Sequence, residues 1–309
     1  MRTARTTRRD THLTYIERVN LAIDFMVPRL SEPLNLHRVA KKAMLSPYHF
    51  HRVFQAITGE TPADFVKRLR LEKAIALLAF SRRTSITSVA LTCGFASPSD
   101  FSRSFKLKYG VAPRSFDIQA WRAAHGEHIQ RIAEPAATDL HVRRLAATTN
   151  PDRFRVRIRE LPAKTVAYIR VLNPYQGDAV LRAYDRLMTW ATRHNIANNQ
   201  WYGYQWENPE VTALADCHYH VAVEAPAVIA RGEIGRSRFP AMLIAEIELD
   251  GGIDLELRAL QYLYGSWLPR SRYVPADQPC FEAWIGRPFA HGMERFTLRA
   301  QLPVKHLPA

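Results

Sequence analysis

A pattern of about twenty residues occurs twice in this chain, and its two copies lie 51 residues apart. The first copy, from Ser46, reads SPYHFHRVFQAITGETPADF, and the second, from Ser97, reads SPSDFSRSFKLKYGVAPRSF. The identical positions are Ser46/Ser97, Pro47/Pro98, Phe50/Phe101, Arg52/Arg103, Phe54/Phe105, Gly59/Gly110, Pro62/Pro113 and Phe65/Phe116. An internal repeat strongly constrains the fold, because one structural unit must form twice.

Each copy predicts a capped amphipathic helix. Ser46 and Ser97 can accept a hydrogen bond at the helix start, and the proline that follows each serine suits the first helical position. Gly59 and Gly110 can end the two helices. The predicted buried stripes are Phe50, Val53, Phe54 and Ile57 in the first copy and Phe101, Phe105 and Tyr109 in the second.

Shorter helices are expected before the two copies, over residues 36–43 and 86–93. A short helix, a tight turn and a second helix with a polar outer face form a helix-turn-helix. We expect a first helix over about 15–30 and a long helix over 62–80 that joins the two helix-turn-helix units. The predicted N-terminal domain is therefore all-α and covers residues 13–121, after a basic tail, 1–12, that is expected to be unstructured.

Charge is distributed unevenly along the chain. Residues 1–150 contain 24 Lys and Arg against 12 Asp and Glu, whereas residues 151–309 contain 19 against 17. A basic domain with helix-turn-helix patterning is typical of a protein that binds double-stranded DNA. The alternative is a helical bundle whose basic residues are ordinary solvated surface.

The outward residues of the second helix of each unit are the candidates for reading base edges in the major groove. They are Tyr48, His51 and Arg52 in the first unit and Ser99, Asp100 and Arg103 in the second. Candidates for phosphate contacts are Lys41, Lys42, Lys106 and Lys108. The two arginines suit bidentate contact with guanine, and salt bridges to neighbouring carboxylates are the alternative. Asp100 could accept a hydrogen bond from a cytosine amino group, hold Arg103 in place, or weaken DNA binding by the second helix-turn-helix unit.

The pattern changes after residue 121. Residues 122–152 read as a linker, with a short helix around 127–132. Strands are then expected over about 154–158, 166–171, 200–206, 217–223, 234–239, 242–248, 281–285 and 295–300, and helices over 179–194 and 255–267. This order predicts an α+β domain over 153–309, built from two pseudo-symmetric βαββ units.

Several function classes find no support in the sequence. No run of 18 or more uncharged apolar residues predicts a membrane span. Cys93, Cys217 and Cys280 form no C-x-x-C motif, which favours a reducing, cytoplasmic location. His218 and His220 alternate along one predicted strand, but the histidines show no metal-ligand spacing. We expect no cofactor and no bound metal.

These motifs resemble known families. Residues 13–121 resemble the AraC/XylS-type DNA-binding domain, most clearly in GFASPSDFSRSFKLKYGVAPRSF. Residues 154–307 resemble the GyrI-like effector-binding domain through YGY at 202–204, NPE at 208–210, YHV at 219–221, WLP at 267–269 and CFEAW at 280–284. The order of the two domains is similar to that of the Rob-like regulators. The resemblance implies a transcriptional activator that contacts RNA polymerase and senses a small molecule.

Aromatic residues are frequent in the C-terminal half. On a strand over 200–206, Trp201 and Gly203 would face one side, and Tyr202 and Tyr204 the other. The candidate effector-binding aromatics are Trp201, Tyr204, Trp206, Tyr219, Tyr262, Trp267 and Trp284. The resemblance adds Glu282 as the carboxylate of the site. An aromatic pocket with one carboxylate suits a lipophilic organic cation, and burial should raise the pKa of that carboxylate.

Three alternatives to an effector pocket stay open. Aromatics at strand spacing can be ordinary core, and the domain could dock a partner protein instead of a small molecule. Some relatives of this domain look like hydrolases, and here Glu282 would be the base beside a tyrosine such as Tyr262. No second acid, metal set or nucleophile is visible in the sequence, so we expect no enzyme. Two reading units in one chain favour a monomer on DNA, and a dimer through the C-terminal half is the alternative.

Overall fold

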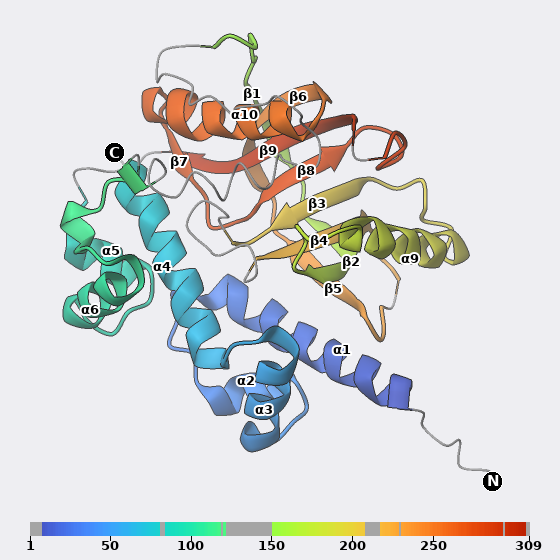
Figure 1. The fold of residues 1–309 in the computed structure, drawn as a ribbon, viewed down its shortest axis with the longest axis horizontal. Coiled ribbons are helices and arrows are strands. Elements are labelled where there is room, and N and C mark those ends of the chain that lie inside the picture. Colours follow the sequence, from blue (N-terminus) through green and yellow to red (C-terminus); the bar gives the residue numbers. More distant parts are fainter. Residues whose placement is uncertain are drawn as a thin grey trace. The chain divides into compact units, whose positions relative to one another are not determined.

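The computed structural model describes residues 8–80, 84–118, 120–121, 150–207, 217–228, 230–292 and 294–306. Contacts between residues divide the chain into two compact units (Figure 1). The first contains the N-terminal helices, and the second contains most of a C-terminal sheet with its helices.

The first unit is helical, as its sequence predicts. Its elements are α1 (Arg8–Met26), η1 (Val27–Arg29), α2 (Leu36–Lys42), α3 (Pro47–Thr58), α4 (Pro62–Phe80), α5 (Ile86–Thr92), α6 (Pro98–Tyr109) and η2 (Pro113–Ser115). The pairs α2–α3 and α5–α6 are the two helix-turn-helix units, and α4 joins them (Figure 1). The expected tail over 1–12 is wrong in part, because the first helix already begins at Arg8.

The caps of the two reading helices follow the repeat. The Ser46 hydroxyl accepts from the His49 N–H at 3.4 Å, and the Ser97 hydroxyl accepts from the Asp100 N–H at 3.1 Å. Gly59 and Gly110 end the helices with φ of 82° and 76°, a left-handed conformation that glycine adopts without steric cost. The serine caps and the left-handed glycines therefore start and end both helices at equivalent positions of the repeat.

Aromatic side chains form the core of each reading unit. Phe50, Phe54, Phe101 and Phe105 are fully buried. The rings of Phe50 and Phe54 lie 5.4 Å apart, and those of Phe101 and Phe105 lie 5.5 Å apart. The repeated phenylalanines thus hold the helices, and the residues between them are left to face outward.

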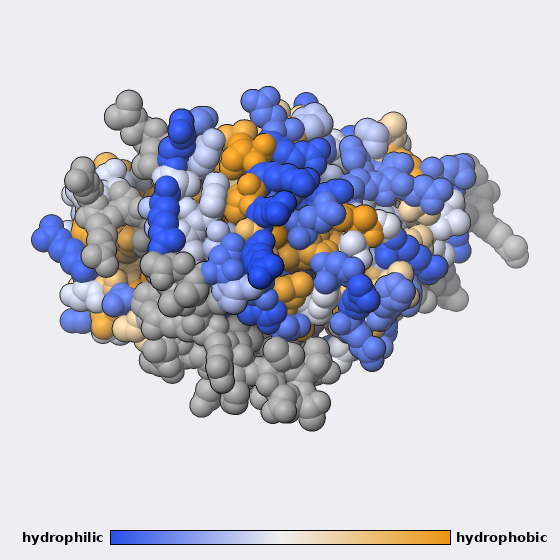
Figure 2. Space-filling model, turned by 90° about the horizontal axis from the view of Figure 1, so that it is seen from above, coloured by the Kyte–Doolittle hydropathy of each residue, from blue (hydrophilic) through white to orange (hydrophobic). Residues whose placement is uncertain are grey.

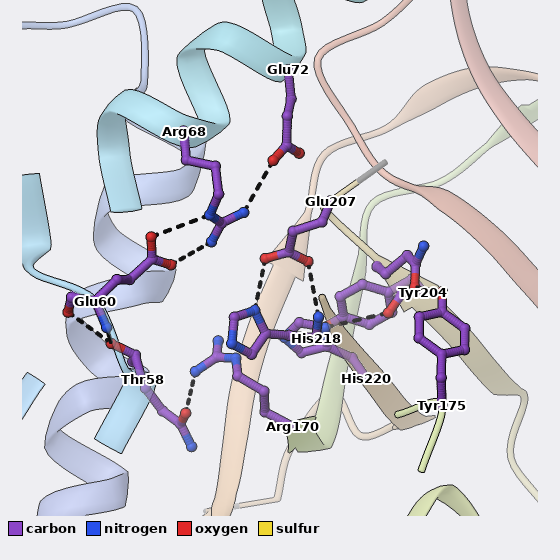
Figure 3. Close-up of polar contacts among 12 residues, drawn as sticks. Thr58, Glu60, Arg68, Glu72, Arg170, Tyr175, Tyr204, Glu207, His218 and His220 are labelled. Atoms are coloured by element: carbon purple, nitrogen blue, oxygen red, sulfur yellow. Dashed lines mark hydrogen bonds and ion pairs between the residues drawn. The ribbon is translucent and has the colours of Figure 1, made fainter. Parts of the chain in front are cut away.

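A buried ion cluster links α4 to the turn after α3. Arg68 donates to both carboxylate oxygens of Glu60, at 3.2 and 2.6 Å, and to Glu72 at 3.1 Å (Figure 3). The side chains of Arg68 and Glu72 are each 5% exposed. One guanidinium therefore joins the N-terminal half of α4 to the chain just before it.

The C-terminal part of the chain is built on one sheet with helices. Its strands are β1 (Arg157–Leu161), β2 (Lys164–Leu172), β3 (Trp201–Gln205), β4 (His218–Glu224), β5 (Ile234–Phe239), β6 (Met242–Gly251), β7 (Tyr273–Pro275), β8 (Cys280–Trp284) and β9 (Phe296–His306). The strand order is β1-β6-β9-β8-β3-β4-β2-β5, and β7 pairs with β9. The helical elements are α9 (Ala179–Arg193), α10 (Ile253–Tyr262), the π-helical turn η5 (Leu263–Trp267) and η6 (Leu268–Arg270).

The sheet is pseudo-symmetric about its two central strands. β2-α9-β3-β4 and β6-α10-β8-β9 have the same order of elements, and β3 pairs with β8 where the two halves meet. Gly203 lies opposite Glu282 in this antiparallel pair. At this position of the central pair, β3 therefore has no side chain, and β8 has a carboxylate.

Some predicted boundaries in the second unit are wrong. β1 begins at Arg157 rather than at residue 154, and Ile158 is 38% exposed although its alternation predicts burial. The reason is that β1 is an edge strand, where one side of the ladder lacks a neighbour. β7, a strand of three residues, was not predicted. The predicted helix over 127–132 and most of the predicted linker lie outside the described residues.

Among the coloured residues in Figure 2, hydrophilic ones predominate on this face, with apolar residues in patches between them. Among the helices that the structure describes, none is long and apolar enough to cross a membrane.

Candidate DNA-reading helices and ligand site

The first candidate reader, α3, exposes the residues that the repeat leaves off its apolar stripe. Tyr48 is 65% exposed, Arg52 is exposed and His51 is partly exposed. Arg52 donates to the Tyr48 hydroxyl at 3.0 Å, one turn away along the helix. The tyrosine therefore holds the guanidinium on the outer face without neutralising its charge.

The second candidate reader, α6, has the same arrangement with different chemistry. Ser99, Asp100 and Arg103 are exposed on it. Among the described residues, no carboxylate lies within ion-pair distance of Arg52 or Arg103. Neither guanidinium group thus forms a salt bridge with any of the described residues. The predicted phosphate contacts, Lys41, Lys42, Lys106 and Lys108, are all exposed.

In the second unit, three polar side chains from three elements meet above the central strands. The Tyr219 hydroxyl of β4 donates to the Glu282 carboxylate of β8, and Glu256 of α10 hydrogen-bonds to the same carboxylate. Gly203 lies below them on β3, and a Cβ there would overlap both the Tyr219 hydroxyl and the Glu282 carboxylate. Glycine is required at this point because the polar cluster occupies the volume of a side chain.

Burial controls the protonation of this acidic cluster. It raises the pKa of Glu282 to about 7, although the hydrogen bonds from Tyr219 and Glu256 oppose that rise. Burial, together with the charge of Glu282 and the hydrogen bond to it, raises the pKa of Glu256 well above its ordinary value. Burial and the nearby Glu282 raise the pKa of Tyr219 as well. The expected rise at Glu282 is confirmed, and the cluster holds a proton near neutral pH.

Aromatic rings lie on the same face of the sheet as Glu282. Trp201 packs on Tyr184 of α9 at 5.3 Å between ring centroids, and Trp284 packs on Phe289 at 4.5 Å. Tyr184 also lies 5.4 Å from Phe289, which connects the two pairs. The structure thus brings two of the predicted tryptophans together on the face that bears the carboxylate.

The other predicted aromatics lie elsewhere. Tyr204 points to the opposite face, where it stacks on His220 at 4.6 Å and where Phe239 lies between it and Trp206. Tyr262 packs on Phe154 at 5.6 Å, and Trp267 stacks on Tyr273 at 5.9 Å. The tyrosine hydroxyl that contacts Glu282 is that of Tyr219, not of Tyr262.

Sequence reasoning missed Glu256, although a signal for it exists. Glu256, Ala259 and Leu263 follow the i, i+3, i+7 spacing of a buried helical stripe, and all three are buried. An acidic residue on an apolar stripe is rarely buried without a polar partner. Its position therefore predicts a polar partner, which the structure identifies as the half-buried Glu282.

The two histidines of β4 have separate environments (Figure 3). The Nδ1 atom of His218 lies 2.9 Å from Oε1 of Glu207, and its backbone N–H donates to the other oxygen at 3.3 Å. His220 stacks on Tyr204. No group of three metal-ligating side chains occurs among the described residues.

Raising the pH from about 5 to about 8 is expected to lower the free energy of unfolding. The raised pKa values of Glu282 and Glu256 mean that the folded state retains protons which the unfolded state, with a carboxyl pKa of about 4.3, has already released. Stability contributed by these protons is therefore present at low pH and is lost as the pH passes about 7. Urea unfolding across this pH range measures the free energy of unfolding. The variant Glu282→Gln should show a weaker dependence of this free energy on pH. An unchanged slope in that variant would contradict the assignment.

Comparison with known families agrees with this architecture. Residues 39–118 match the model of a helix-turn-helix domain, and residues 154–305 match that of a GyrI-like small molecule binding domain. The chain is thus a two-domain protein with a helix-turn-helix domain followed by a GyrI-like domain. The helix-turn-helix region is of the AraC/XylS type, and the GyrI-like domain follows it along the chain.

Similar proteins match the N-terminal third. The probable transcriptional regulator LumQ of Photobacterium leiognathi is 31% identical over 105 residues, which cover 33% of this chain and 42% of LumQ. The transcriptional activator RhaS of Escherichia coli is 35% identical over 105 residues, covering 34% of this chain and 37% of RhaS. The DNA-binding domain of AdpA in complex with a target DNA is similar at 26% identity, with a TM-score of 0.32, over 36% of this chain and 98% of that domain. The chain spans less than half the length of the two curated relatives.

Proposed function

We propose that this protein is a sequence-specific, DNA-binding transcriptional regulator. The observation that carries the proposal is the repeated helix-turn-helix, which presents an exposed arginine at the same place on α3 and α6, with no carboxylate partner among the residues that the structure describes. Two equivalent helices in one chain suit two successive major-groove segments, about 34 Å apart on one face of B-DNA. The domain limits 13–121 and 153–309, and binding as a monomer, belong to this proposal.

Replacing Arg52 with alanine is expected to weaken operator binding by about 1–3 kcal/mol and non-specific binding far less. The reason is that a bidentate contact with guanine is made only at the correct base, whereas phosphate contacts are made on any sequence. Selection of bound fragments from sheared DNA, at two salt concentrations, would give the operator and both affinities.

The matched variant is Arg103→Ala, which removes the equivalent arginine of the second reader. If both variants lose operator affinity, α3 and α6 both contact the operator. If only Arg52→Ala loses operator affinity, α3 alone reads it. If Arg52→Ala loses the same binding affinity on operator and on random DNA, the base-reading role of Arg52 is wrong.

The proposed direction of regulation is activation through contact with RNA polymerase. RhaS, which is similar over the helix-turn-helix region, is described as a transcriptional activator. Transcription in a purified system, with the operator placed upstream of a promoter, would test the direction. A decrease in transcript would contradict activation.

We further propose that the GyrI-like domain binds a small lipophilic cation at Glu282. Trp201 and Trp284 lie on the same face as Glu282, and a half-buried carboxylate beside aromatic rings can neutralise and hold an organic cation. The match to a small molecule binding domain supports a ligand site rather than a protein-docking surface or a hydrolase. We therefore propose that the protein is not an enzyme.

Ligand binding to the folded state raises thermal stability, so a panel of lipophilic cations would test this site. Benzyltrimethylammonium is a suitable member, with neopentylbenzene as its neutral isostere. Glu282→Gln should abolish a shift that the cation causes. Failure of every cation to raise the melting temperature would favour the protein-docking alternative.

A further inference from the structure

Lys164, at the start of β2, is buried and has no hydrogen-bonding partner among the described residues. It is 5% exposed, and none of the described residues accepts a hydrogen bond from its ammonium group. β4 separates β2 from β3 in the sheet, so the side chain reaches across one strand. Its Nζ atom lies 4.1 Å from the ring centroid of Tyr202 on β3 and 4.6 Å from that of Phe281 on β8.

This amine lies on the face of the sheet opposite the acidic cluster. Tyr202 and Phe281 each adjoin a residue of the central pair, Gly203 and Glu282 respectively, and successive residues of a strand point to opposite faces. Their rings are 6.0 Å apart and turn their faces toward Lys164. The domain therefore has a carboxylate with aromatic rings on one face and an ammonium with aromatic rings on the other.

The electrostatic surroundings of Lys164 leave its charge only partly compensated. Burial lowers the pKa of the amine to about 8, although the negative charge of Glu224 on β4 opposes that shift. No carboxylate of the described residues lies within ion-pair distance of Nζ. A buried ammonium with no acceptor is costly, because it has lost hydration without gaining a hydrogen bond.

We propose that Lys164 is the anion-binding group of a second ligand site, which takes a small apolar carboxylate. The ammonium would donate to the carboxylate, and the apolar body of the ligand would pack beside Tyr202 and Phe281. A singly charged carboxylate fits better than inorganic phosphate, whose higher charge one ammonium cannot compensate. Pro162 and Ala163, just before Lys164, are exposed, so the site adjoins the surface turn between β1 and β2.

The proposal is tested by titrating the full-length protein with three carboxylates: benzoate, 1-naphthoate and decanoate. Calorimetry should detect binding of at least one of them, and the matching uncharged amide should bind at least about tenfold more weakly. Binding should weaken as the pH rises above about 8, because the amine then loses its proton. Absence of binding by all three acids, or equal binding of acid and amide, overturns the proposal.

Two variants locate the site. Lys164→Met replaces the ammonium with an apolar chain of similar length and should reduce carboxylate affinity at least about tenfold. Lys305→Met removes the same charge from an exposed position on β9 and should leave the affinity unchanged. Equal carboxylate affinity in wild type and Lys164→Met overturns the proposal.

Benzyltrimethylammonium separates this site from the one proposed at Glu282. Lys164→Met should retain any cation binding that the wild type shows, which also demonstrates that the variant is folded. If no cation binds the wild type, its melting temperature serves as the folding control, and the carboxylate titrations decide the question at Lys164 alone. The two proposals can therefore fail independently.

Discussion

Replacing Arg68 with alanine is expected to lower the free energy of unfolding by about 3–5 kcal/mol. The change removes the guanidinium that pairs with Glu60 at 2.6 Å and Glu72 at 3.1 Å, and it leaves Glu72 buried. A buried carboxylate without its cation must protonate or draw in water, and both responses cost free energy. Urea unfolding followed by circular dichroism in the helical band measures the loss.

Two control variants make this expectation specific to the buried charge. Lys67→Ala removes a cation from the exposed neighbouring position of α4 and should change stability by less than about 0.5 kcal/mol. Converting all three members together, as Arg68→Met with Glu60→Gln and Glu72→Met, should recover most of the loss, because no charge then remains buried without a partner. A loss in Arg68→Ala no larger than in Lys67→Ala would show that the cluster contributes nothing measurable.

Replacing Gly203 with alanine is expected to lower stability by about 1–3 kcal/mol and to disrupt the acidic cluster. The new Cβ would occupy the space of the Tyr219 hydroxyl and the Glu282 carboxylate, which hydrogen-bond to each other directly above it. Either the two side chains separate or β3 moves away from its neighbours on the sheet. Thermal unfolding measures the cost, and cation titration measures the damage to the site.

A second glycine provides the matched control. Gly265, in the turn η5, has open space around the position of a Cβ, so Gly265→Ala should be neutral or slightly stabilising. Adding Tyr219→Phe to Gly203→Ala should recover only part of the loss, because the ring carbon that bears the hydroxyl also lies 2.6 Å from the new Cβ. A melting temperature of Gly203→Ala equal to that of the wild type would contradict this account.

The first unit could be predicted from sequence because its signals are local. A serine cap, a glycine end and an i, i+3, i+4 stripe each involve residues within a few positions of one another, and the repeat supplies every signal twice. The long helix α4 was predicted from after Pro62 to about Phe80, close to the bounds that the structure has, Pro62–Phe80. The start of α1 at Arg8 was missed, because the sequence there resembles a polar basic tail.

The ligand site was predicted only in part, because it depends on contacts between distant segments. The alternation of strand residues correctly placed Trp201 and Tyr204 on opposite faces of β3. Alternation cannot say which strand becomes the neighbour, so the pairing of Glu282 with Gly203 was invisible in the sequence. Glu256 was overlooked for the same reason, since its partner lies 26 residues away on another element.

The sequence by itself determined the two helix-turn-helix units, their caps, their aromatic cores and the outward position of Arg52 and Arg103. Only the tertiary structure decided that Glu256 meets Glu282 and that Lys164 is buried against two aromatic rings. Helix caps and stripes follow from bond geometry and from neighbours one turn away. A buried charge acquires its neighbours, and with them its pKa, only when sheet register and helix packing bring remote segments together.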